Sequence, residues 1–251
     1  MGPLGPPTDF DLEECMTATE LPRPELTGVS GVPETALSEA LLATLPPNET
    51  EAPWTVNCSA VLWTTRPTRE AAESLPPALR GRRGVVVIGG IVRYIETPVG
   101  PYDEVFGIVM SGYGRQSIGT VTFMAVDSRQ SLVGGRTNWA MPKTLASFEG
   151  RIGNKETLVA TGQDSLGWRV SARPWVLGPS VPVRSKAITR QEFPGGLLGD
   201  SRLRARGKAR PALVDVEVES DGPLAGWLRP GKHLGSVAEG VTFSMGVPDL
   251  A

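Results

Sequence analysis

The chain has 251 residues, of which 40% are hydrophobic and 21% charged, so it can bury one substantial core. Its net charge of −2, from 25 basic and 27 acidic residues, argues against a protein that binds nucleic acid or anionic membranes through its overall charge. With 30 glycines, 23 prolines and only 6% aromatic residues, the composition favours many turns and short strands, and therefore predicts a β-rich fold.

The first 50 residues differ in composition from the rest. Residues 1–50 are rich in Pro, Gly, Thr and Glu, which predicts a flexible N-terminal extension with a short helical stretch, Pro33 to Leu45, docked on the body. Met16 is an alternative start. Residues 51–251 are then a single domain. With no long apolar run and no secretory signal pattern, we expect a soluble cytoplasmic protein whose Cys15 and Cys58 are reduced thiols.

The first half of this domain alternates apolar runs with turn residues. Trp54–Thr65, Gly84–Ile95, Val105–Met110 and Ile118–Val126 have the β-branched, apolar character of buried strands, and Pro67–Leu75 is typical of a short helix. The Gly84–Ile95 strand contains a glycine pair but lacks the G-x-G-x-x-G spacing and a following helix pattern. A dinucleotide site is therefore not predicted there.

The second half is predicted to be a meander. Arg202, Arg204, Arg206, Lys208 and Arg210 alternate with small or apolar residues, which predicts a solvated strand edge or a subunit contact rather than a nucleic-acid face. At least eight strands and one or two helices favour a mainly β domain, a curled sheet or cone-like β-barrel around a pocket. The predicted strands are Leu145–Ile152, Glu156–Ala160, Leu166–Ala172, Ser201–Arg206, Ala212–Ser220 and Val241–Met245, with a helical turn at Pro223–Leu228.

One lysine stands in an unusual setting. Lys143 follows Trp139, Met141 and Pro142, so its backbone is constrained and we expect its side chain to point inward. A buried lysine is costly to keep charged, and is therefore a candidate nucleophile. The Lys-Thr pair after Gly135 is not a phosphate loop, because Pro142 stands where that motif requires glycine.

The remaining motifs exclude other chemistry. His233 is the only histidine, which excludes a metal site of several histidines and leaves a Ser-His-Asp triad without support. We interpret His233 as structural. No metal and no organic cofactor are predicted.

Three motifs in a fixed order carry a family resemblance. Pro101-Tyr102-Asp103-Glu104, then Gly135-Arg136, then Met141-Pro142-Lys143 resemble the acetoacetate decarboxylase family over about residues 54–248. The resemblance implies a β-rich cone around a buried lysine that forms a Schiff base with a small β-keto acid, in a homo-oligomer. By position, Lys143 matches the nucleophile and Glu104 matches a pocket carboxylate and proton donor.

The sequence also departs from the family pattern. Thr144 stands where the family has a second lysine, Gly89 or a neighbour occupies the place of another pocket glutamate, and the N-terminal pocket arginine has no clear match. Without a second lysine, we expect desolvation to neutralise Lys143, with Arg136 as the nearest cation. Predicted substrate-binding residues are Arg136, Tyr102, Trp139 and Met141. The alternatives are a non-decarboxylating homologue that binds a small acid or hydrophobic ligand, and an imine-forming aldolase or dehydratase.

Overall fold

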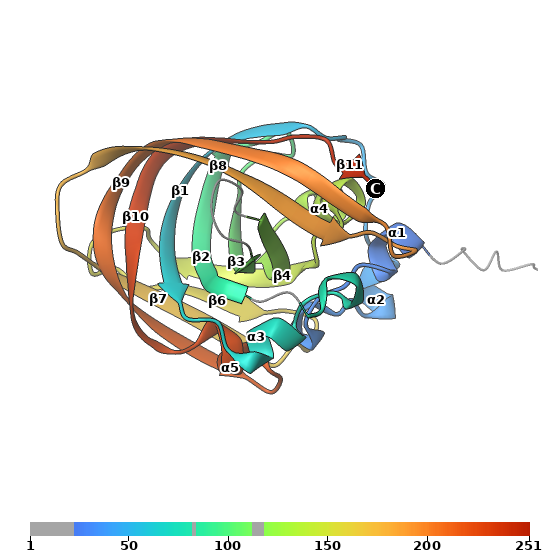
Figure 1. The fold of residues 1–251 in the computed structure, drawn as a ribbon, viewed down its shortest axis with the longest axis horizontal. Helices are drawn as coiled ribbons and strands as arrows, with labels where there is room; N and C mark the ends of the chain where they lie inside the picture. The colour runs from blue at the N-terminus through green and yellow to red at the C-terminus, as the bar shows by residue number, and fades with distance from the viewer. Residues whose placement is uncertain (1–22, 82–83, 112–117) are drawn as a thin grey trace, which may run out of the picture.

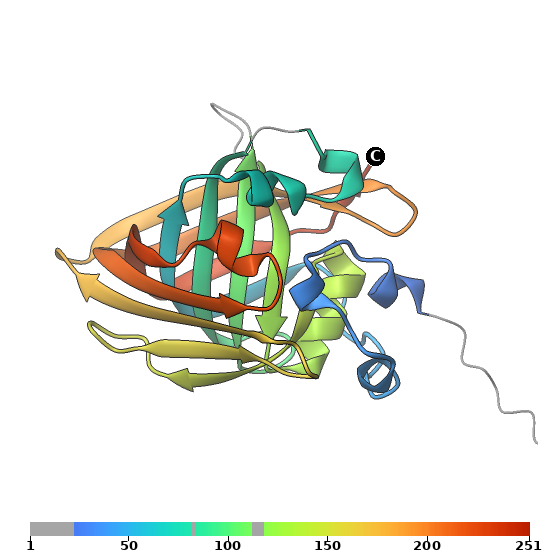
Figure 2. The ribbon, with the colours of Figure 1, turned by 90° about the horizontal axis from the view of Figure 1, so that it is seen from below.

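The structure, a computed structural model, describes residues 23–81, 84–111 and 118–251. These residues form one large curled sheet with short helices at its margins (Figures 1 and 2). The strands are β1 (Trp54–Thr65), β2 (Gly84–Glu96), β3 (Tyr102–Ser111), β4 (Ile118–Val126), β5 (Lys143–Gly150), β6 (Leu158–Gly162), β7 (Trp168–Val176), β8 (Val181–Glu192), β9 (Leu198–Ser220), β10 (Gly231–Met245) and β11 (Asp249–Leu250). The helices are α1 (Pro24–Thr27), η1 (Pro33–Thr35), α2 (Glu39–Leu42), α3 (Arg69–Glu73), η2 (Pro77–Leu79), α4 (Arg129–Trp139) and α5 (Leu224–Leu228).

The sheet closes on itself through its two longest strands. The order runs β10-β1-β2-β3-β4-β5-β6-β7-β9, and β9 pairs again with β10. β8 forms a second connection, because it pairs with β4 at Ile118–Gly119 and with β9 along Leu198–Ala209. β9 pairs with β7 only further along, through residues 212–220. The two halves of β9 therefore belong to different parts of the curled sheet.

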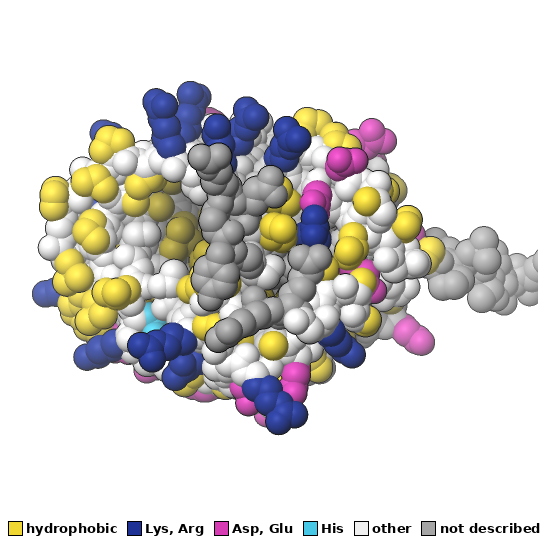
Figure 3. Space-filling model, viewed as in Figure 1, with side chains coloured by type: hydrophobic (Ala, Val, Ile, Leu, Met, Phe, Trp, Pro, Cys, Tyr) yellow, Lys and Arg dark blue, Asp and Glu magenta, His cyan; other side chains and the backbone are white. Residues whose placement is uncertain are grey.

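Two hydrophobic clusters lie on opposite faces of the β1–β4 sheet. Residues alternate along a strand, so Val105 and Val109 of β3 join one cluster with Val214 and Val216 of β9. Tyr102 joins the other cluster with residues of α4, and Phe106 and Ala209 pack against it. This second cluster surrounds Lys143. Figure 3 shows one face of the molecule, which is hollowed and carries hydrophobic side chains around the hollow.

The predicted fold class is confirmed: the chain is mainly β, with a curled sheet and short helices. β1 and β4 have the predicted bounds. The long elements that were not predicted are β8 and the helix α4, and the short elements α1, η2 and β11 were not predicted either. The predicted strands Ser201–Arg206 and Ala212–Ser220 are parts of the single 23-residue strand β9. The basic residues of β9 do not lie on a sheet edge, because β8 and β10 flank this strand. None of the helices in the described ranges is both long and apolar enough to cross a membrane.

The segment before β1 packs against the sheet from residue 23 onward. Leu26 and Val32 are buried, and the amide of Val32 donates a hydrogen bond to the carbonyl of Thr122 in β4. The Trp168 indole donates to the carbonyl of Glu34, and the Glu34 carboxylate accepts from the Ser220 hydroxyl and the Leu224 amide. The rest of the expected extension, residues 1–22 with Cys15 and Met16, lies outside the described residues.

Candidate functional site

Lys143 is the first residue of β5 and is placed by the end of α4. This helix ends at Trp139 because Ala140 adopts a left-handed conformation, with φ 51°, and its amide closes the last turn. Three residues after Ala140, β5 begins beside β4, with Lys143 opposite Met124. The side chain turns into the second cluster, where Nζ donates to Glu104 Oε2 at 2.8 Å and to Ser131 Oγ at 2.9 Å.

Lys143 and Glu104 form a buried ion pair. The residues are only 4% and 3% exposed, although they are 39 positions apart in the sequence. Tyr94 donates from its hydroxyl to Glu104 Oε1 at 3.1 Å, and the Tyr102 ring centroid lies 5.2 Å from Nζ. Both carboxylate oxygens are thus hydrogen-bonded. A buried charge pair of this kind is stable only when its remaining lone pairs and protons find partners.

A glycine in α4 makes room for the lysine. A Cβ built on Gly135 would overlap Cδ of Lys143 and lie 2.5 Å from its Cε. The aliphatic stem of Lys143 therefore passes directly over the backbone of α4 on its way to Glu104. This close approach requires a residue without a side chain, and it explains one of the two adjacent glycines in a helix that glycine otherwise weakens.

The pKa of Lys143 differs from the sequence-based expectation. Burial lowers it, as predicted, but the negative charge of Glu104, with a further contribution from Tyr102, outweighs burial and the pKa lies above its ordinary value. The expectation of neutralisation by desolvation alone is therefore wrong. In this structure the amine is an ammonium group paired with a carboxylate.

The neighbours of the pair hold their protons. Burial, with the nearby Glu104 charge, raises the pKa of the Cys58 thiol to about 12. Burial also raises the pKa of Tyr102 to about 12, against the opposing effect of Lys143, and holds the pKa of Tyr94 well above its usual range. At neutral pH the thiol and both phenols are therefore neutral.

The structure places the other sequence-predicted residues differently. Arg136 is buried, and its three nitrogens donate to the carbonyls of Lys143, Leu26 and Thr35. Burial lowers the pKa of Arg136 to about 9. Trp139 donates its indole N–H to the carbonyl of Gly246. The polar groups of these two residues therefore support the backbone, whereas Tyr102 lies beside the lysine and Met141 is buried in the same cluster.

Sequence reasoning did not identify two polar residues at the lysine. Ser131 precedes Lys143 by 12 residues and lies in α4, a helix that was not predicted. Tyr94 is 10 residues from Glu104 but opposite Tyr102 across β2 and β3. Antiparallel register would have placed Tyr94 near Glu104 once β2 and β3 were paired correctly. Ser131 had no comparable signal.

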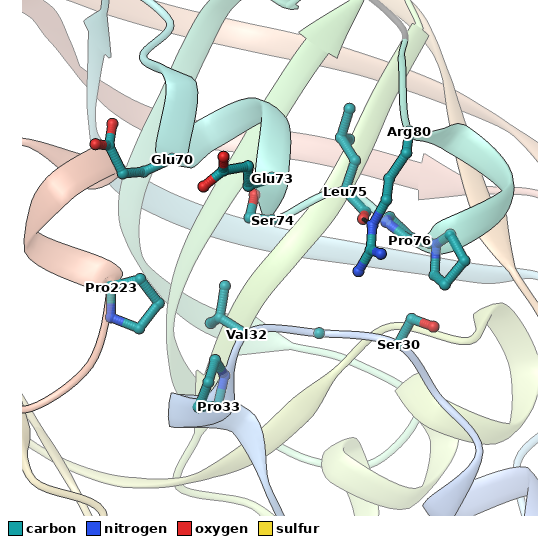
Figure 4. A pocket seen from close by; sticks show the side chains of 12 residues that line it. Ser30, Val32, Pro33, Glu70, Glu73, Ser74, Leu75, Pro76, Arg80 and Pro223 are labelled. Atoms are coloured by element: carbon teal, nitrogen blue, oxygen red, sulfur yellow. Dashed lines mark hydrogen bonds between the residues drawn. The ribbon is translucent and has the colours of Figure 1, made fainter.

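A separate surface cavity of about 440 Å³ lies elsewhere (Figure 4). Side chains from α3, from the loop that follows it and from the N-terminal segment face one another across this cavity, including Glu70, Glu73 and Arg80. Lys143 and Glu104 do not line it. The Lys143 pair, rather than this cavity, therefore defines the candidate site. Within the described ranges, no three His, Cys, Asp or Glu side chains are grouped as metal ligands.

Together, the curled sheet and the buried Lys143–Glu104 pair define a mainly β protein with a lysine amine buried inside the sheet. The family profile described as acetoacetate decarboxylase (ADC) matches residues 38–174, more than half of the chain. The chain therefore belongs to the acetoacetate decarboxylase family. A comparison with curated proteins gave no match.

Solved structures share the fold at low sequence identity. Acetoacetate decarboxylase from Legionella pneumophila is 14% identical, with a TM-score of 0.55, over 82% of this chain and 90% of that one. The enduracididine biosynthesis enzyme MppR, complexed with pyruvate, is 12% identical, with a TM-score of 0.61, over 85% of this chain and 95% of that one. At these identities the likeness concerns the fold.

Proposed function

We propose that this protein is a lyase that decarboxylates a small β-oxo acid through a Schiff base at Lys143. The observation that carries the proposal is the 2.8 Å contact between Lys143 Nζ and Glu104 Oε2 in a buried setting. An ammonium group cannot attack a ketone, but proton transfer across this contact gives a neutral amine and a protonated carboxyl group. Glu104 thus stores the proton that the next steps require.

The proposed steps follow from this exchange. The amine attacks the keto carbon, and Glu104 protonates the departing hydroxyl group, so that the carbinolamine loses water and becomes an iminium ion. The bond to the carboxylate then breaks, its electron pair moves toward the iminium nitrogen, and carbon dioxide leaves. Glu104, reprotonated from solvent, protonates the enamine carbon, and hydrolysis releases the ketone and the lysine. The net reaction consumes one proton.

Ser131 and Tyr102 assist this chemistry in the proposal. The Ser131 hydroxyl lies 2.9 Å from Nζ and holds the nitrogen in place when Glu104 moves to protonate substrate. Tyr102 keeps its proton at neutral pH and is available to donate a hydrogen bond to a substrate oxygen. Both groups are positioned on rigid elements, which favours accurate orientation of the reacting atoms.

Borohydride trapping tests the proposal directly. We expect reduction in the presence of acetoacetate to leave a mass adduct on the peptide that contains Lys143. Lys143→Ala should lose the adduct and at least about a thousandfold in kcat, with the fold retained by circular dichroism. Lys155→Ala, at an exposed lysine, is the matched control and should keep both. Trapping on another lysine, or on none, would contradict the proposal.

A second candidate is aldol or dehydratase chemistry from the same iminium ion. One solved structure of MppR contains the condensation product of pyruvate and imidazole 4-carboxaldehyde, with a TM-score of 0.59 to this chain. Arg136, the cation nearest in sequence, is bound to backbone carbonyls and does not offer a substrate carboxylate its guanidinium. Product analysis with pyruvate and an aldehyde separates the two candidates: a condensation product without carbon dioxide release favours the second.

A non-catalytic role is the third alternative, because Thr144 stands where the family pattern has a second lysine, and Gly89 or a neighbour stands where it has another pocket glutamate. Thr144 is buried, and its hydroxyl donates to the carbonyl of Ala36 rather than lying free beside Lys143. Binding of an oxo acid with a shift in melting temperature, but with no adduct and no turnover, would favour this role.

A further inference from the structure

The face of the sheet that carries Glu104 continues beyond it as an apolar surface. Along β3, Phe106 and Ile108 follow Glu104 at alternate positions, and all three therefore point to the same side. Leu62 of β1 lies opposite Gly90, which in turn lies opposite Phe106. From across the curled sheet, β8 and β10 add further apolar residues. We call this surface the inner apolar face; its members are Leu62, Phe106, Ile108, Val183, Val241 and Phe243.

The side chains of the described residues do not cover the inner apolar face completely. Leu62, Phe106 and Ile108 are only half-buried, although they pack against the cluster around Lys143. Val183 is 37% exposed. It lies on the same side of β8 as Gln191, which is buried and hydrogen-bonded to Val121, so Val183 points inward and not to the outside. Large apolar side chains that face inward and stay accessible mark a ligand surface.

Charge is absent from most of this surface. Among the described residues, the positions on this side of β3, of 86–94 in β2, of 181–191 in β8 and of 201–209 in β9 contain one charged residue, Glu104. The cations of β9 all lie on its other side, exemplified by the exposed Arg204 next to Ala205. A ligand along the inner apolar face therefore meets carbon, and only its end nearest Glu104 meets charge.

The surface is also long. Ile108 is four residues beyond Glu104, which corresponds to about 13 Å along the strand. A Cβ at Gly90 would lie 2.6 Å from Phe106 Cζ and 2.7 Å from Leu62 Cδ2, so this glycine lets both side chains lie against the sheet. These dimensions suit an extended hydrocarbon chain with one polar end.

We propose that the inner apolar face binds an apolar substituent on the substrate's keto carbon, so that the preferred substrate is a β-oxo acid with a medium-length hydrocarbon chain rather than acetoacetate. This inference rests on the proposed function of Lys143, because the keto carbon must reach Nζ. The chain then extends from Lys143 past Phe106 toward Ile108. No new chemistry is required, since the reacting atoms are the same in both substrates.

The test compares acetoacetate with the β-oxo acid in which a hexyl group replaces the methyl group. Each methylene that enters an apolar pocket raises kcat/KM severalfold, so the hexyl compound should exceed acetoacetate by more than about tenfold. A ratio below about ten, with both compounds trapped on Lys143 by borohydride, overturns this inference and leaves the proposed function intact. If neither compound gives an adduct, the proposed function fails and this inference fails with it.

Two variants at neighbouring positions test where the hydrocarbon chain of the substrate binds. Ala205 lies on the inner side of β9 opposite Phe243, and Ala205→Phe should fill the space and lower the hexyl-to-methyl ratio at least about tenfold. Arg204→Phe adds the same side chain on the outer side of the strand and should leave the ratio unchanged. An equal fall in both variants, or no fall in Ala205→Phe when its melting curve is normal, would show that the chain binds elsewhere.

Discussion

At the scale of single residues, the charge of Lys143 depends on its buried partners. Burial lowers the pKa of Lys143, but Glu104 and Tyr102 together more than offset this effect, so the pKa is higher in the folded protein than in the unfolded chain. A raised folded-state pKa stabilises the protein at pH values below the ordinary value of about 10.5, and this stabilisation disappears as pH rises through the folded-state pKa. The stability of the folded protein at alkaline pH therefore depends on the Lys143–Glu104 ion pair.

This linkage predicts a pH dependence of unfolding. Relative to a Lys143→Met, Glu104→Leu double variant, the free energy of unfolding of the wild type should be constant near neutral pH. Above about pH 10.5 it should fall by up to about 1.4 kcal/mol per pH unit. Urea denaturation of both proteins at about pH 8 and pH 11 measures the difference. A difference that stays the same at both pH values would contradict the raised pKa.

The packing of Gly135 against the lysine predicts a steric effect on the site. Gly135→Ala should displace the Lys143 side chain and cost about 1–3 kcal/mol of stability, because the new Cβ overlaps Cδ. Trapping on Lys143 should fall in parallel. Gln130→Ala, on the exposed side of the same helix, is the control and should change neither. Normal stability and trapping in Gly135→Ala would show that the helix adjusts without cost.

At the scale of elements, the N-terminal segment is held by the arginine that was expected to bind substrate. Arg136 connects α4 to Leu26, Thr35 and the backbone of Lys143 with three hydrogen bonds in a buried setting. A planar guanidinium reaches three carbonyls at once, which an ammonium group cannot do with the same geometry. Binding the substrate and holding the N-terminal segment in place are therefore two different roles for Arg136, and they predict different effects of a substitution.

Arg136→Lys separates these expectations. It keeps the charge but leaves buried carbonyls without donors, and we expect a loss of about 2–4 kcal/mol in the free energy of unfolding. Limited proteolysis should then cleave between residues 23 and 50, where the wild type resists. Arg184→Lys, at an exposed position of β8, is the matched control and should behave as wild type. A large rise in KM with unchanged stability would instead support the substrate-binding prediction.

Elements with regular patterns could be predicted from the sequence, and elements without them could not. β1 and β4 were found with their bounds because apolar, β-branched runs end at clear turns. The helix α4 was missed because it contains two adjacent glycines and is buried around much of its circumference, from Ser131 to Arg136. A helix buried on several sides has no polar face to give it a period. β8 was missed because its inward positions from Ser185 onward are small or polar, so the strand lacks the alternation of large apolar and polar residues that marks a half-buried strand.

The candidate site was predictable only in part for a similar reason. Lys143 and Glu104 were identified by resemblance to a family, since a separation of 39 residues leaves no local signal of contact. The protonation state of Lys143 could not be predicted from the sequence. Burial lowers its pKa and a nearby negative charge raises it, and both effects depend on where the side chains lie in three dimensions. The substrate-binding role was predicted for Arg136 because it is close to Lys143 in the sequence, but closeness in sequence does not decide which group its guanidinium contacts.

At the scale of the whole molecule, the sheet closes through β9 and β10, and the two faces of β1–β4 are packed to different degrees. Leu62, Phe106 and Ile108 on the inner apolar face are only half-buried, whereas the opposite face is packed with large buried side chains such as Trp63 and Trp227. Self-association and a cytoplasmic location stay predictions. Sedimentation at several protein concentrations measures self-association. If the basic outer side of β9 forms the contact between subunits, the association constant should change with salt concentration.

The hydrogen bonds from Arg136 to Leu26 and Thr35 have a practical consequence for homology-defined boundaries. The family profile begins at residue 38, so both acceptors precede the region by which relatives are recognised. A protein fragment trimmed to that region would contain both Lys143 and Glu104. It would lack the carbonyls of Leu26 and Thr35, which orient the guanidinium of Arg136. Recombinant fragments chosen by family limits are thus poor starting material for enzymology of this protein.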